Sequence, residues 1–357
     1  MKKVGILNSG GDCSGLNAVI ASVVKTGSDL GYSFVGFEKG WEGILSPMMY
    51  RPLTRADVRG ISYLGGTILG TVNKGRFGAK AGEGDSRQIP EAILQEAKAN
   101  LQAIGVDGLI VIGGDGTLAG AKQLSDFGVR IVGVPKTIDN DLMATDRTFG
   151  FSTAAQVVVD ALDRIHTTAS SHGRVILVET MGRNTGWIAL RAGLAGGAHA
   201  ILLPEFEFDL GKLVDYLRSR QAEGKASVVV VAEGAKVGGA GVSEYMTSEQ
   251  EVHLGGVSGY LMRQIEKIGP GEFEMRNTVL GHVQRGGTPN SADRVIAKAY
   301  GCEAIKAYHQ GEFGKVVVYN HQHMGLEPLE KCVGSLKRVT RDTMEYVTAH
   351  DLGIFMD

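Results

Sequence analysis

Short apolar runs alternate along the chain with longer stretches in which apolar residues recur every three or four positions. Continuous apolar runs of this length are typical of strands buried on both faces of a parallel sheet, and the longer period is typical of amphipathic helices. The runs predict strands at residues 4–7, 33–37, 108–112, 130–134, 174–179, 200–203, 227–232, 277–280 and 315–319. The periodic stretches predict helices at residues 14–30, 89–104, 152–171, 184–194, 210–221, 256–267 and 291–309.

This alternation predicts an α/β protein built from doubly wound lobes with mainly parallel sheets. A length of 357 residues favours two such lobes over one. No stretch rich in Pro, Gly and Ser marks a linker between the lobes. We expect the chain to cross between them within residues 135–150, because this stretch carries turn residues and a dense acidic run.

The composition contains one anomaly, a glycine excess of 52 residues accompanied by only 8 prolines. The glycines follow no G-x-y register, which excludes collagen and low-complexity disorder. We therefore expect many tight turns, or backbone that comes very close to something.

Charge and cysteine content narrow the class of protein further. A formal net charge of -2 offers no electrostatic basis for binding nucleic acid or an anionic membrane. Three widely spaced cysteines match no disulfide or CxxC pattern, and no apolar run approaches the length of a membrane span. These features predict a cytoplasmic protein, in which a local basic cluster could still bind a small anionic substrate.

Two loops with an identical GGD core follow predicted strands, at Gly10–Asp12 and Gly113–Asp115. Glycine at the carboxyl end of a strand lets phosphate oxygens approach backbone N–H groups at a helix N-terminus. Neither loop matches the dinucleotide fingerprint or the Walker loop. The alternatives are that the glycines only permit tight turns and that Asp12 and Asp115 are helix caps; the repetition of the core favours phosphate.

A second candidate site is the segment PKTIDND at residues 135–141, which follows another predicted strand. Two carboxylates and a lysine in one short loop suit metal-assisted phosphoryl transfer, in which one carboxylate accepts a proton and another holds Mg²⁺. A solvated acidic turn is the alternative, since Asp and Asn are favoured in turns.

Basic residues recur at the ends of predicted strands and helices, where a planar guanidinium could recognise phosphate. A glutamate, Glu233, directly follows one strand and could accept sugar hydroxyls. The basic residues are Arg174, Arg183, Arg276, His282 and Arg285.

Taken together, these segments resemble the 6-phosphofructokinase family. The matching segments appear in family order from residue 4 to about 300, and PKTIDND together with GHVQRGG is highly specific. They are SGGDCSGLN (9–17), GGTILG (65–70), IGGDGT (112–117), PKTIDND (135–141), GFSTA (150–154), SSHGR (170–174), MGRNTG (181–186) and LGHVQRGGTP (280–289).

The resemblance implies Mg²⁺-assisted phosphoryl transfer to the C1 hydroxyl of fructose 6-phosphate, at an active site between the lobes. It implies a donor lobe of residues 1–150 plus about 284–335, and a sugar-phosphate lobe of residues 151–283 plus the C-terminal segment. It also implies a homo-oligomer, a dimer or tetramer, in which Arg174 and Arg276 reach the 6-phosphate in a neighbouring subunit's site.

The implied roles fall into three groups. Asp139 is the general base, with Thr137, Asp141 and Arg183 as further catalytic residues, and Asp115 binds Mg²⁺. The donor-binding residues are Gly11, Asn73, Lys74, Gly114, Asp115, Gly116, Thr117 and Lys136. The substrate-binding residues are Thr137, Ile138, Asp139, Arg174, Met181, Gly182, Arg183, Glu233, Arg276, His282, Val283, Gln284 and Arg285.

At the positions that select the phosphoryl donor, the chain combines a residue typical of ATP enzymes with one typical of pyrophosphate enzymes. In the family, glycine at the position of Gly116 leaves room for the α-phosphate of ATP, whereas aspartate there accompanies pyrophosphate. Lysine at the position of Lys136 is in turn common in pyrophosphate enzymes. An aspartate at position 116 would block the pocket and exclude ATP, whereas the ammonium of Lys136 can lie beside a phosphate chain without excluding it. We therefore favour ATP, with pyrophosphate as the alternative.

Other departures concern the nucleotide and regulation. Lys74 or Arg76 could replace an arginine that usually meets the donor phosphates, and Trp41 stands where a tyrosine near the nucleotide is common. Ala21, His166 and His199 replace effector-site residues of bacterial allosteric relatives. Remoter alternatives are a non-catalytic nucleotide or sugar-phosphate sensor and a lipid- or NAD-kinase relative, although GGDGT alone supports the latter.

Overall fold

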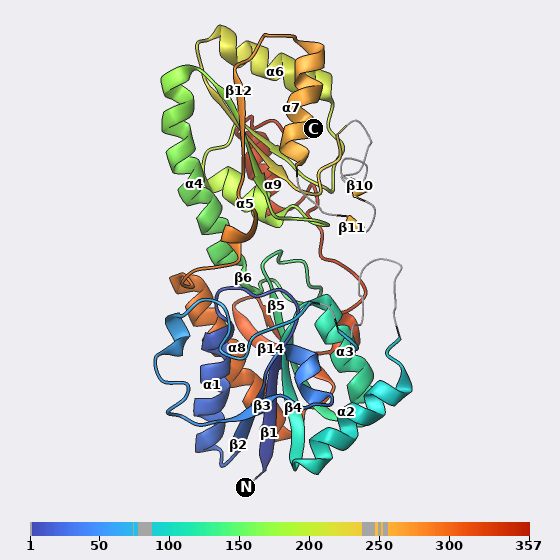
Figure 1. Cartoon of the computed structure of the whole chain (residues 1–357). Coiled ribbons are helices and arrows are strands. Elements are labelled where there is room, and N and C mark those ends of the chain that lie inside the picture. The colour runs from blue at the N-terminus through green and yellow to red at the C-terminus, as the bar shows by residue number, and fades with distance from the viewer. Residues whose placement is uncertain (1, 74, 78–87, 238–246, 249–250, 253–255) are drawn as a thin grey trace. The chain divides into compact units, whose positions relative to one another are not determined.

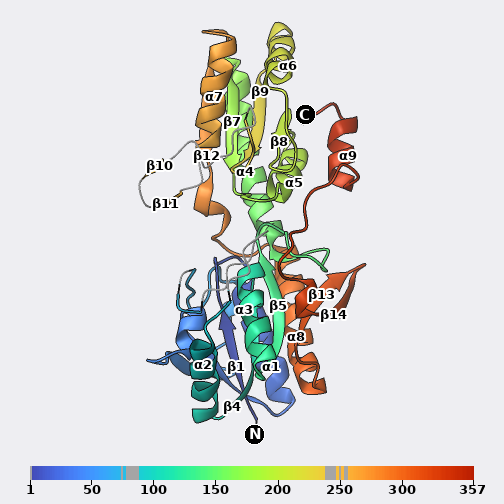
Figure 2. The same cartoon turned by 90° about the vertical axis from the view of Figure 1, so that its right-hand side faces the viewer.

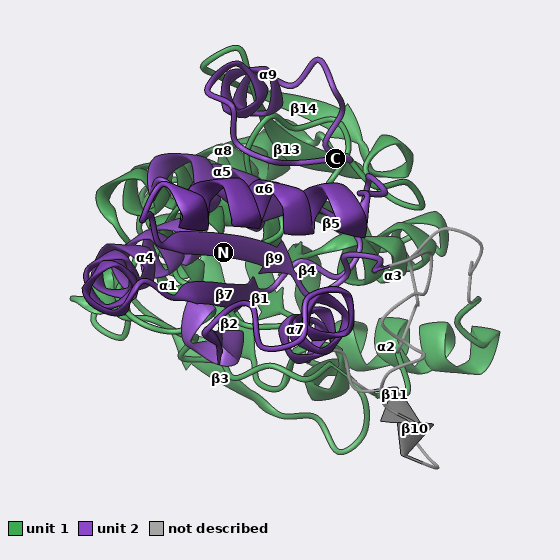
Figure 3. Cartoon of the chain, turned by 90° about the horizontal axis from the view of Figure 1, so that it is seen from above, with its two compact units in different colours: residues 1–153, 285–337 green, residues 154–284, 338–357 purple. Residues whose placement is uncertain are grey.

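The chain forms two compact units, each made of two separate segments. The computed structural model describes residues 2–73, 75–77, 88–237, 247–248, 251–252 and 256–357. Unit 1 consists of Met1–Thr153 and Arg285–Lys337, and unit 2 of Ala154–Gln284 and Arg338–Asp357 (Figure 3). The chain therefore passes between the units after Thr153, Gln284 and Lys337.

Unit 1 is built on a sheet of eight strands in the order β14-β13-β5-β4-β1-β2-β3, with β6 paired to β5 (Figure 1). The pairs β1–β2, β1–β4, β4–β5, β5–β6 and β5–β13 are parallel, whereas the edge strands β3 and β14 are antiparallel to their neighbours. The strands are β1 (Lys3–Asn8), β2 (Ser33–Phe37), β3 (Tyr50–Leu53), β4 (Val106–Gly113), β5 (Arg130–Thr137), β6 (Phe149–Gly150), β13 (Lys315–Asn320) and β14 (His323–Pro328).

Helices cover both faces of this sheet, because its central strands are apolar on both sides. All residues of β4 except Asp107 are buried. Helices α1 (Leu16–Asp29) and α8 (Ser291–Gln310) pack against each other, and α2 (Glu91–Ala103) and α3 (Asp115–Asp126) pack against β4 (Figure 2). A core that includes Leu7, Phe37, Leu109, Val111 and Leu118 joins the sheet to α2 and α3.

The strand order places a topological switch point between β1 and β4. The chain continues from β1 to β2 on one side, whereas β4 and β5 extend the sheet on the other side. Loops that follow two strands at such a point diverge in opposite directions and leave a crevice at the carboxyl edge of the sheet. The two GGD segments follow β1 and β4, and so both lie at this edge.

Unit 2 contains a four-stranded parallel sheet in the order β12-β7-β9-β8. Its strands are β7 (Val175–Thr180), β8 (Ala200–Leu202), β9 (Ser227–Ala232) and β12 (Met275–Val279). Its helices are α4 (Phe151–His172, whose first three residues belong to unit 1), α5 (Trp187–Ala195), α6 (Leu210–Ala222), α7 (Val257–Ile268) and α9 (Met344–Asp351). Unit 2 also contains a short antiparallel pair, β10 (Thr247–Ser248) and β11 (Glu251–Val252).

The predicted α/β class with mainly parallel sheets is confirmed by this topology. Apolar periodicity did not identify β3 or β14, because both are edge strands whose residues are mostly exposed or half-buried. The predicted helix 14–30 begins only at Leu16, after Gly15 at a φ of 111°. In the part of the chain that the structure describes, no helix is long and apolar enough to cross a membrane.

Candidate functional site

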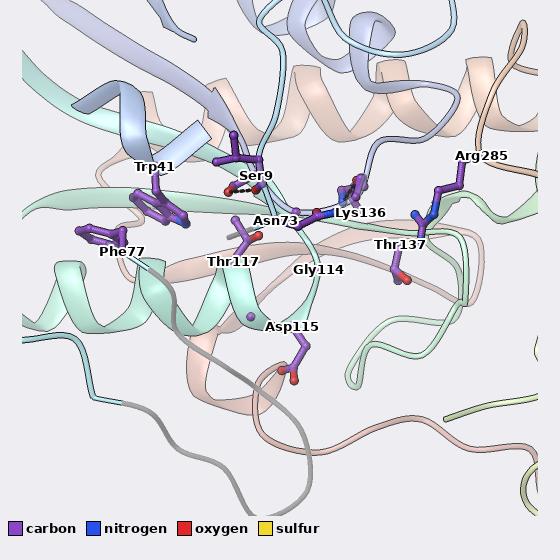
Figure 4. Close-up of a pocket in the computed structure, with 14 residues that line it drawn as sticks. Ser9, Trp41, Asn73, Phe77, Gly114, Asp115, Thr117, Lys136, Thr137 and Arg285 are labelled. Atoms are coloured by element: carbon purple, nitrogen blue, oxygen red, sulfur yellow. Dashed lines mark hydrogen bonds between the residues drawn. The ribbon is translucent and has the colours of Figure 1, made fainter. Parts of the chain in front are cut away.

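The loops that follow β1 and β4 form a pocket of about 230 Å³ in unit 1 (Figure 4). The amide of Ser9 donates to the carbonyl of Ile112 at 3.1 Å, and the amide of Gly10 donates to the carbonyl of Val72 at 3.2 Å. The pocket is lined by Ser9, Gly10, Gly11, Trp41, Val72, Asn73, Phe77, Gly114, Asp115, Gly116, Thr117, Lys136, Thr137 and Arg285. Seven of the eight residues predicted to bind the donor are therefore together, and Lys74 lies outside the described residues.

Two of the lining glycines suit their surroundings. Gly10 has a φ of 81°, in the left-handed region that favours glycine. A Cβ on Gly11 would lie 2.5 Å from Nη1 of Arg285. Glycine at this position thus lets a guanidinium rest directly on the loop backbone.

Two cationic side chains enter the pocket next to these glycines. Lys136 is only 4% exposed, and its ammonium donates to the carbonyl of Gly11. Burial lowers the pKa of Lys136 below its ordinary value. Arg285 donates to the carbonyl of Asp12 at 3.2 Å. With the N-terminus of α3 at Asp115, these groups make a strongly anion-attracting end of the pocket.

An aromatic pair lies at the other end of the pocket (Figure 4). The rings of Trp41 and Phe77 stack with their centroids 4.3 Å apart and their planes at 18°. Trp41 is 5% exposed, and its Nε1 has no hydrogen-bond partner among the described residues. Trp41 is therefore both a core aromatic and a pocket wall. The donor-binding residues predicted from the sequence did not include Ser9, Val72 or Phe77, although Ser9 begins the matching segment SGGDCSGLN.

Two carboxylates, those of Asp115 and Asp141, influence each other in unit 1. Oδ1 of Asp115 accepts the amide of Gly334 at 2.9 Å, while its buried Oδ2 has no partner among the described residues. Burial and the charge of Asp141 raise the pKa of Asp115. Burial also raises the pKa of Asp141, although hydrogen bonding to Thr137 opposes the shift. An open carboxylate oxygen with a second carboxylate nearby is a suitable place for Mg²⁺, which takes only one or two protein carboxylates alongside substrate phosphates.

The loop that carries Asp139 is held rigidly by its neighbours. The amide of Asp139 donates to Oγ1 of Thr137 at 3.1 Å. Asn140 adopts a φ of 51°, and its side-chain oxygen accepts the amide of Thr148 at 2.9 Å. The Thr148 hydroxyl donates to the carbonyl of Thr137 at 2.7 Å. The acidic loop is thus half-buried and hydrogen-bonded to the segment around Thr148.

In unit 2, the loops after β7, β9 and β12 meet at the carboxyl edge of the sheet. The amide of Met181 donates to Oε1 of Gln284 at 3.2 Å, and the amide of Gly182 donates to Oε1 of Glu233 at 3.4 Å. Arg183 and His282 are exposed beside them. The structure therefore gathers Met181, Gly182, Arg183, Glu233, His282, Val283 and Gln284 within unit 2, whereas Thr137, Ile138, Asp139 and Arg285 belong to unit 1.

Gln284 differs from the other predicted substrate-binding residues in its surroundings. It is 1% exposed, and its amide group donates to the carbonyl of Gly281 at 2.9 Å while accepting from Met181. Both ends of the amide are therefore used to join two loops of unit 2.

Arg174 and Arg276 lie at the opposite, amino edge of the same sheet. Arg174 immediately precedes β7, and Arg276 is paired in register with Ile176 near the start of that strand. Both guanidiniums contact Oε1 of Glu274, at 2.6 Å for Arg174 and 3.1 Å for Arg276. The structure thus pairs these two arginines but separates them, along β7, from Met181.

Arg76, the proposed replacement for a donor-binding arginine, does not line the pocket. Its Nε lies 3.1 Å from Oε2 of Glu42, and its Nη2 donates to the carbonyl of Ser46 at 3.1 Å. The sequence could not reveal this pairing, because Glu42 is more than thirty positions away.

The predicted effector-site substitutions His166 and His199 lie together in unit 2. Their rings meet edge to face with centroids 5.6 Å apart, in a cavity that Arg220 and Lys225 also line. Burial, together with the charges of Arg220 and His166, lowers the pKa of His199 to about 4. The imidazole of His199 is therefore neutral at pH 7.

Comparison with known proteins agrees with this architecture. A family model described as phosphofructokinase matches residues 3–308. The chain belongs to the phosphofructokinase family. It is 46% identical to an ATP-dependent 6-phosphofructokinase of Chloroflexus aggregans, over 99% of this chain and 97% of that protein. It is 45% identical to a pyrophosphate–fructose 6-phosphate 1-phosphotransferase of Streptomyces coelicolor, over 99% of each.

A solved phosphofructokinase structure from Saccharomyces cerevisiae matches the fold with a TM-score of 0.76 and 32% identity. The match covers 92% of this chain but only 45% of the yeast chain, so this chain spans about half the length of that relative. Relatives of nearly equal identity thus carry ATP and pyrophosphate names, and overall similarity does not select the phosphoryl donor.

Proposed function

We propose that this protein is an ATP-dependent 6-phosphofructokinase, which transfers a phosphoryl group to the C1 hydroxyl of fructose 6-phosphate. The observation that carries the choice of donor is that Gly116 lines the pocket that also holds Lys136, Arg285 and the stacked Trp41. Pyrophosphate would use only the cationic end. A nucleotide would also use the aromatic end, where a base can stack on a ring.

In this proposal the chain binds the donor phosphates with backbone and two cations. The glycines of the GGD loops admit phosphate oxygens to the N-terminus of α3. Lys136 and Arg285 offset the negative charge that spreads over the transferred group in the transition state. Asp115, with Asp141 beside it, would hold Mg²⁺, which would supply further charge neutralisation when bound.

Asp139 is the proposed general base. Its carboxylate would take the proton of the C1 hydroxyl as the C1 oxygen forms a bond to the terminal phosphorus of ATP and the bond to ADP breaks. The rigid Thr137–Thr148 framework supports this role, because a base must be held at the reacting hydroxyl. Thr137 and Arg183 are proposed to hold the reacting groups.

Acceptor binding is assigned mainly to unit 2. Met181, Glu233 and His282 would recognise the sugar, and Arg285 would contribute from unit 1. Arg174 and Arg276 are proposed to bind the 6-phosphate in a neighbouring subunit's site. Their place at the amino edge of the sheet, away from Met181, supports a separate role and a homo-oligomer.

The experiment that tests the proposal is a coupled assay of the purified protein with fructose 6-phosphate and Mg²⁺, comparing ATP with pyrophosphate. We expect the higher kcat/KM with ATP. Turnover with pyrophosphate alone would reverse the donor assignment in favour of the alternative that Lys136 supports. Binding of both substrates without turnover would instead identify a non-catalytic sensor.

A further inference from the structure

The loop Met181–Gly186 connects β7 to α5 and depends on other segments of unit 2 for its position. Arg183 and Asn184 are exposed, and Gly182 adopts a φ of 137°. A loop that projects an arginine toward an anionic ligand must be fixed at both ends, because the guanidinium sits on a long flexible side chain. The β7 end is fixed by Gln284 and Glu233, as described above.

Glu205 fixes the other end of this loop. Its carboxylate accepts the amide of Gly186 at 2.9 Å on Oε1 and 3.0 Å on Oε2, where α5 begins. Oε1 also accepts the amide of Val339 at 3.1 Å. A single carboxylate therefore ties the loop to the C-terminal segment that returns the chain to unit 2.

The surroundings of this contact are built to admit the carboxylate. A Cβ on Gly186 would lie 3.0 Å from Oε2 of Glu205 and 2.6 Å from Cδ2 of Leu203, so glycine is needed for the close approach. In the middle of the loop, Arg338 donates to the carbonyl of Asn184 at 3.1 Å. The loop is thus bonded to Glu205 at Gly186 and to Arg338 at Asn184.

We propose that Glu205 is a positioning residue for the acceptor site, which sets the place of Arg183 by fixing the end of its loop. This inference rests on the proposed function, in which Arg183 contacts the sugar phosphate. Glu205 itself need not touch either substrate.

The chemistry of the contact favours a carboxylate over an amide. The N–H groups of Gly186 and Val339 converge on Oε1, and Oε2 shares the Gly186 N–H at the N-terminus of α5, where negative charge is favoured. A glutamine could keep one oxygen on the two amides, but its NH₂ group would then face the Gly186 N–H in place of Oε2, and the negative charge would be lost. Burial raises the pKa of Glu205, while the amides of Gly186 and Val339 oppose the shift, as expected for a carboxylate held by donors.

The test compares Glu205→Gln and Glu205→Ala with the matched control Glu207→Gln, an exposed glutamate two residues along the same loop. Steady-state kinetics give KM for fructose 6-phosphate and for the donor separately. Hydrogen–deuterium exchange of the full chain gives the protection of peptides that cover residues 181–187, with peptides of β9 as an internal reference.

We expect both Glu205 variants to raise KM for fructose 6-phosphate by about tenfold or more, as loss of a charge-assisted hydrogen bond implies. KM for the donor should stay within about twofold, and exchange should rise in 181–187 but not in β9. The control should match the wild type. Unchanged exchange in 181–187, an unchanged KM for fructose 6-phosphate, or an equal rise of both KM values would each overturn the proposal.

The proposed function and the role of Glu205 are tested by different measurements. A wild-type protein that turns over neither donor would contradict the proposed function. The exchange data would still show whether Glu205 fixes the loop, because they need no substrate.

Discussion

The amide nitrogen of Ser9 lies 3.1 Å from the carbonyl oxygen of Ile112, so the ends of β1 and β4 are joined by a hydrogen bond directly before their glycine loops. Residues about a hundred positions apart thereby become one structure. The strand order explains this, because β1 and β4 are parallel neighbours at a topological switch point. Residues of both GGD segments therefore line one pocket, Gly10 and Gly11 from the first and Gly114 and Asp115 from the second.

Replacing Gly116 by aspartate should abolish the use of ATP. The new carboxylate would enter the pocket beside the donor phosphates, and an unpaired like charge in a partly buried site costs several kcal/mol. We expect kcat/KM for ATP to fall at least ~100-fold, with a smaller loss for pyrophosphate, as measured with both donors in the coupled assay.

Helix stability provides the control for this variant. Gly116 lies in the first turn of α3, where aspartate is favourable and glycine is a poor helix former. Gly116→Asp should therefore unfold at the wild-type temperature or slightly above it, and Gly116→Ala should retain substantial ATP activity. ATP kinetics unchanged by the aspartate would show that steric room at Gly116 does not select the donor.

The sequence predicted these loops well because their chemistry is local. A glycine run after an apolar strand indicates a carboxyl-edge loop wherever the strand lies in the sheet, and the motifs supplied the family. By contrast, Arg76 and Glu42 meet only through the folded chain, and so the sequence left Arg76 as a donor-binding candidate. The same holds for Glu205, whose partners Gly186 and Val339 are distant in sequence and bind through backbone amides.

Asp139→Asn should remove turnover while leaving both substrates able to bind. Asparagine has the same shape as aspartate but cannot accept the C1 proton, and a general base contributes about 10²–10⁴-fold to rate. We expect kcat to fall by that factor and KM values to change by less than about threefold. Asp146→Asn, on the exposed continuation of the same loop, should leave kcat unchanged. Turnover of Asp139→Asn at the wild-type rate would exclude Asp139 as the base.

Trp41 should report nucleotide binding through its fluorescence. The chain has two tryptophans, and Trp187→Phe leaves Trp41 as the only one. A base that stacks on the Trp41–Phe77 pair changes the polarity around the indole, so saturating MgATP should change its emission and pyrophosphate should not. The reciprocal variant Trp41→Phe should lose this signal and raise KM for ATP severalfold, because a smaller ring stacks less surface. An equal response to both donors would place the base elsewhere.

Lys136 should make donor binding sensitive to alkaline pH. Burial lowers the pKa of its ammonium, and only the charged form attracts phosphate. The charge is therefore present below the lowered pKa, and affinity for ATP should fall as pH rises through it, at a lower pH than an exposed lysine would allow. Lys136→Met keeps most of the buried stem and removes the charge, so it should raise KM for ATP at neutral pH and abolish the alkaline dependence of log KM. Lys122→Met, which alters a half-buried lysine of α3 paired with Asp126, should leave the profile unchanged. An alkaline limb that persists in Lys136→Met would assign the titration to another group.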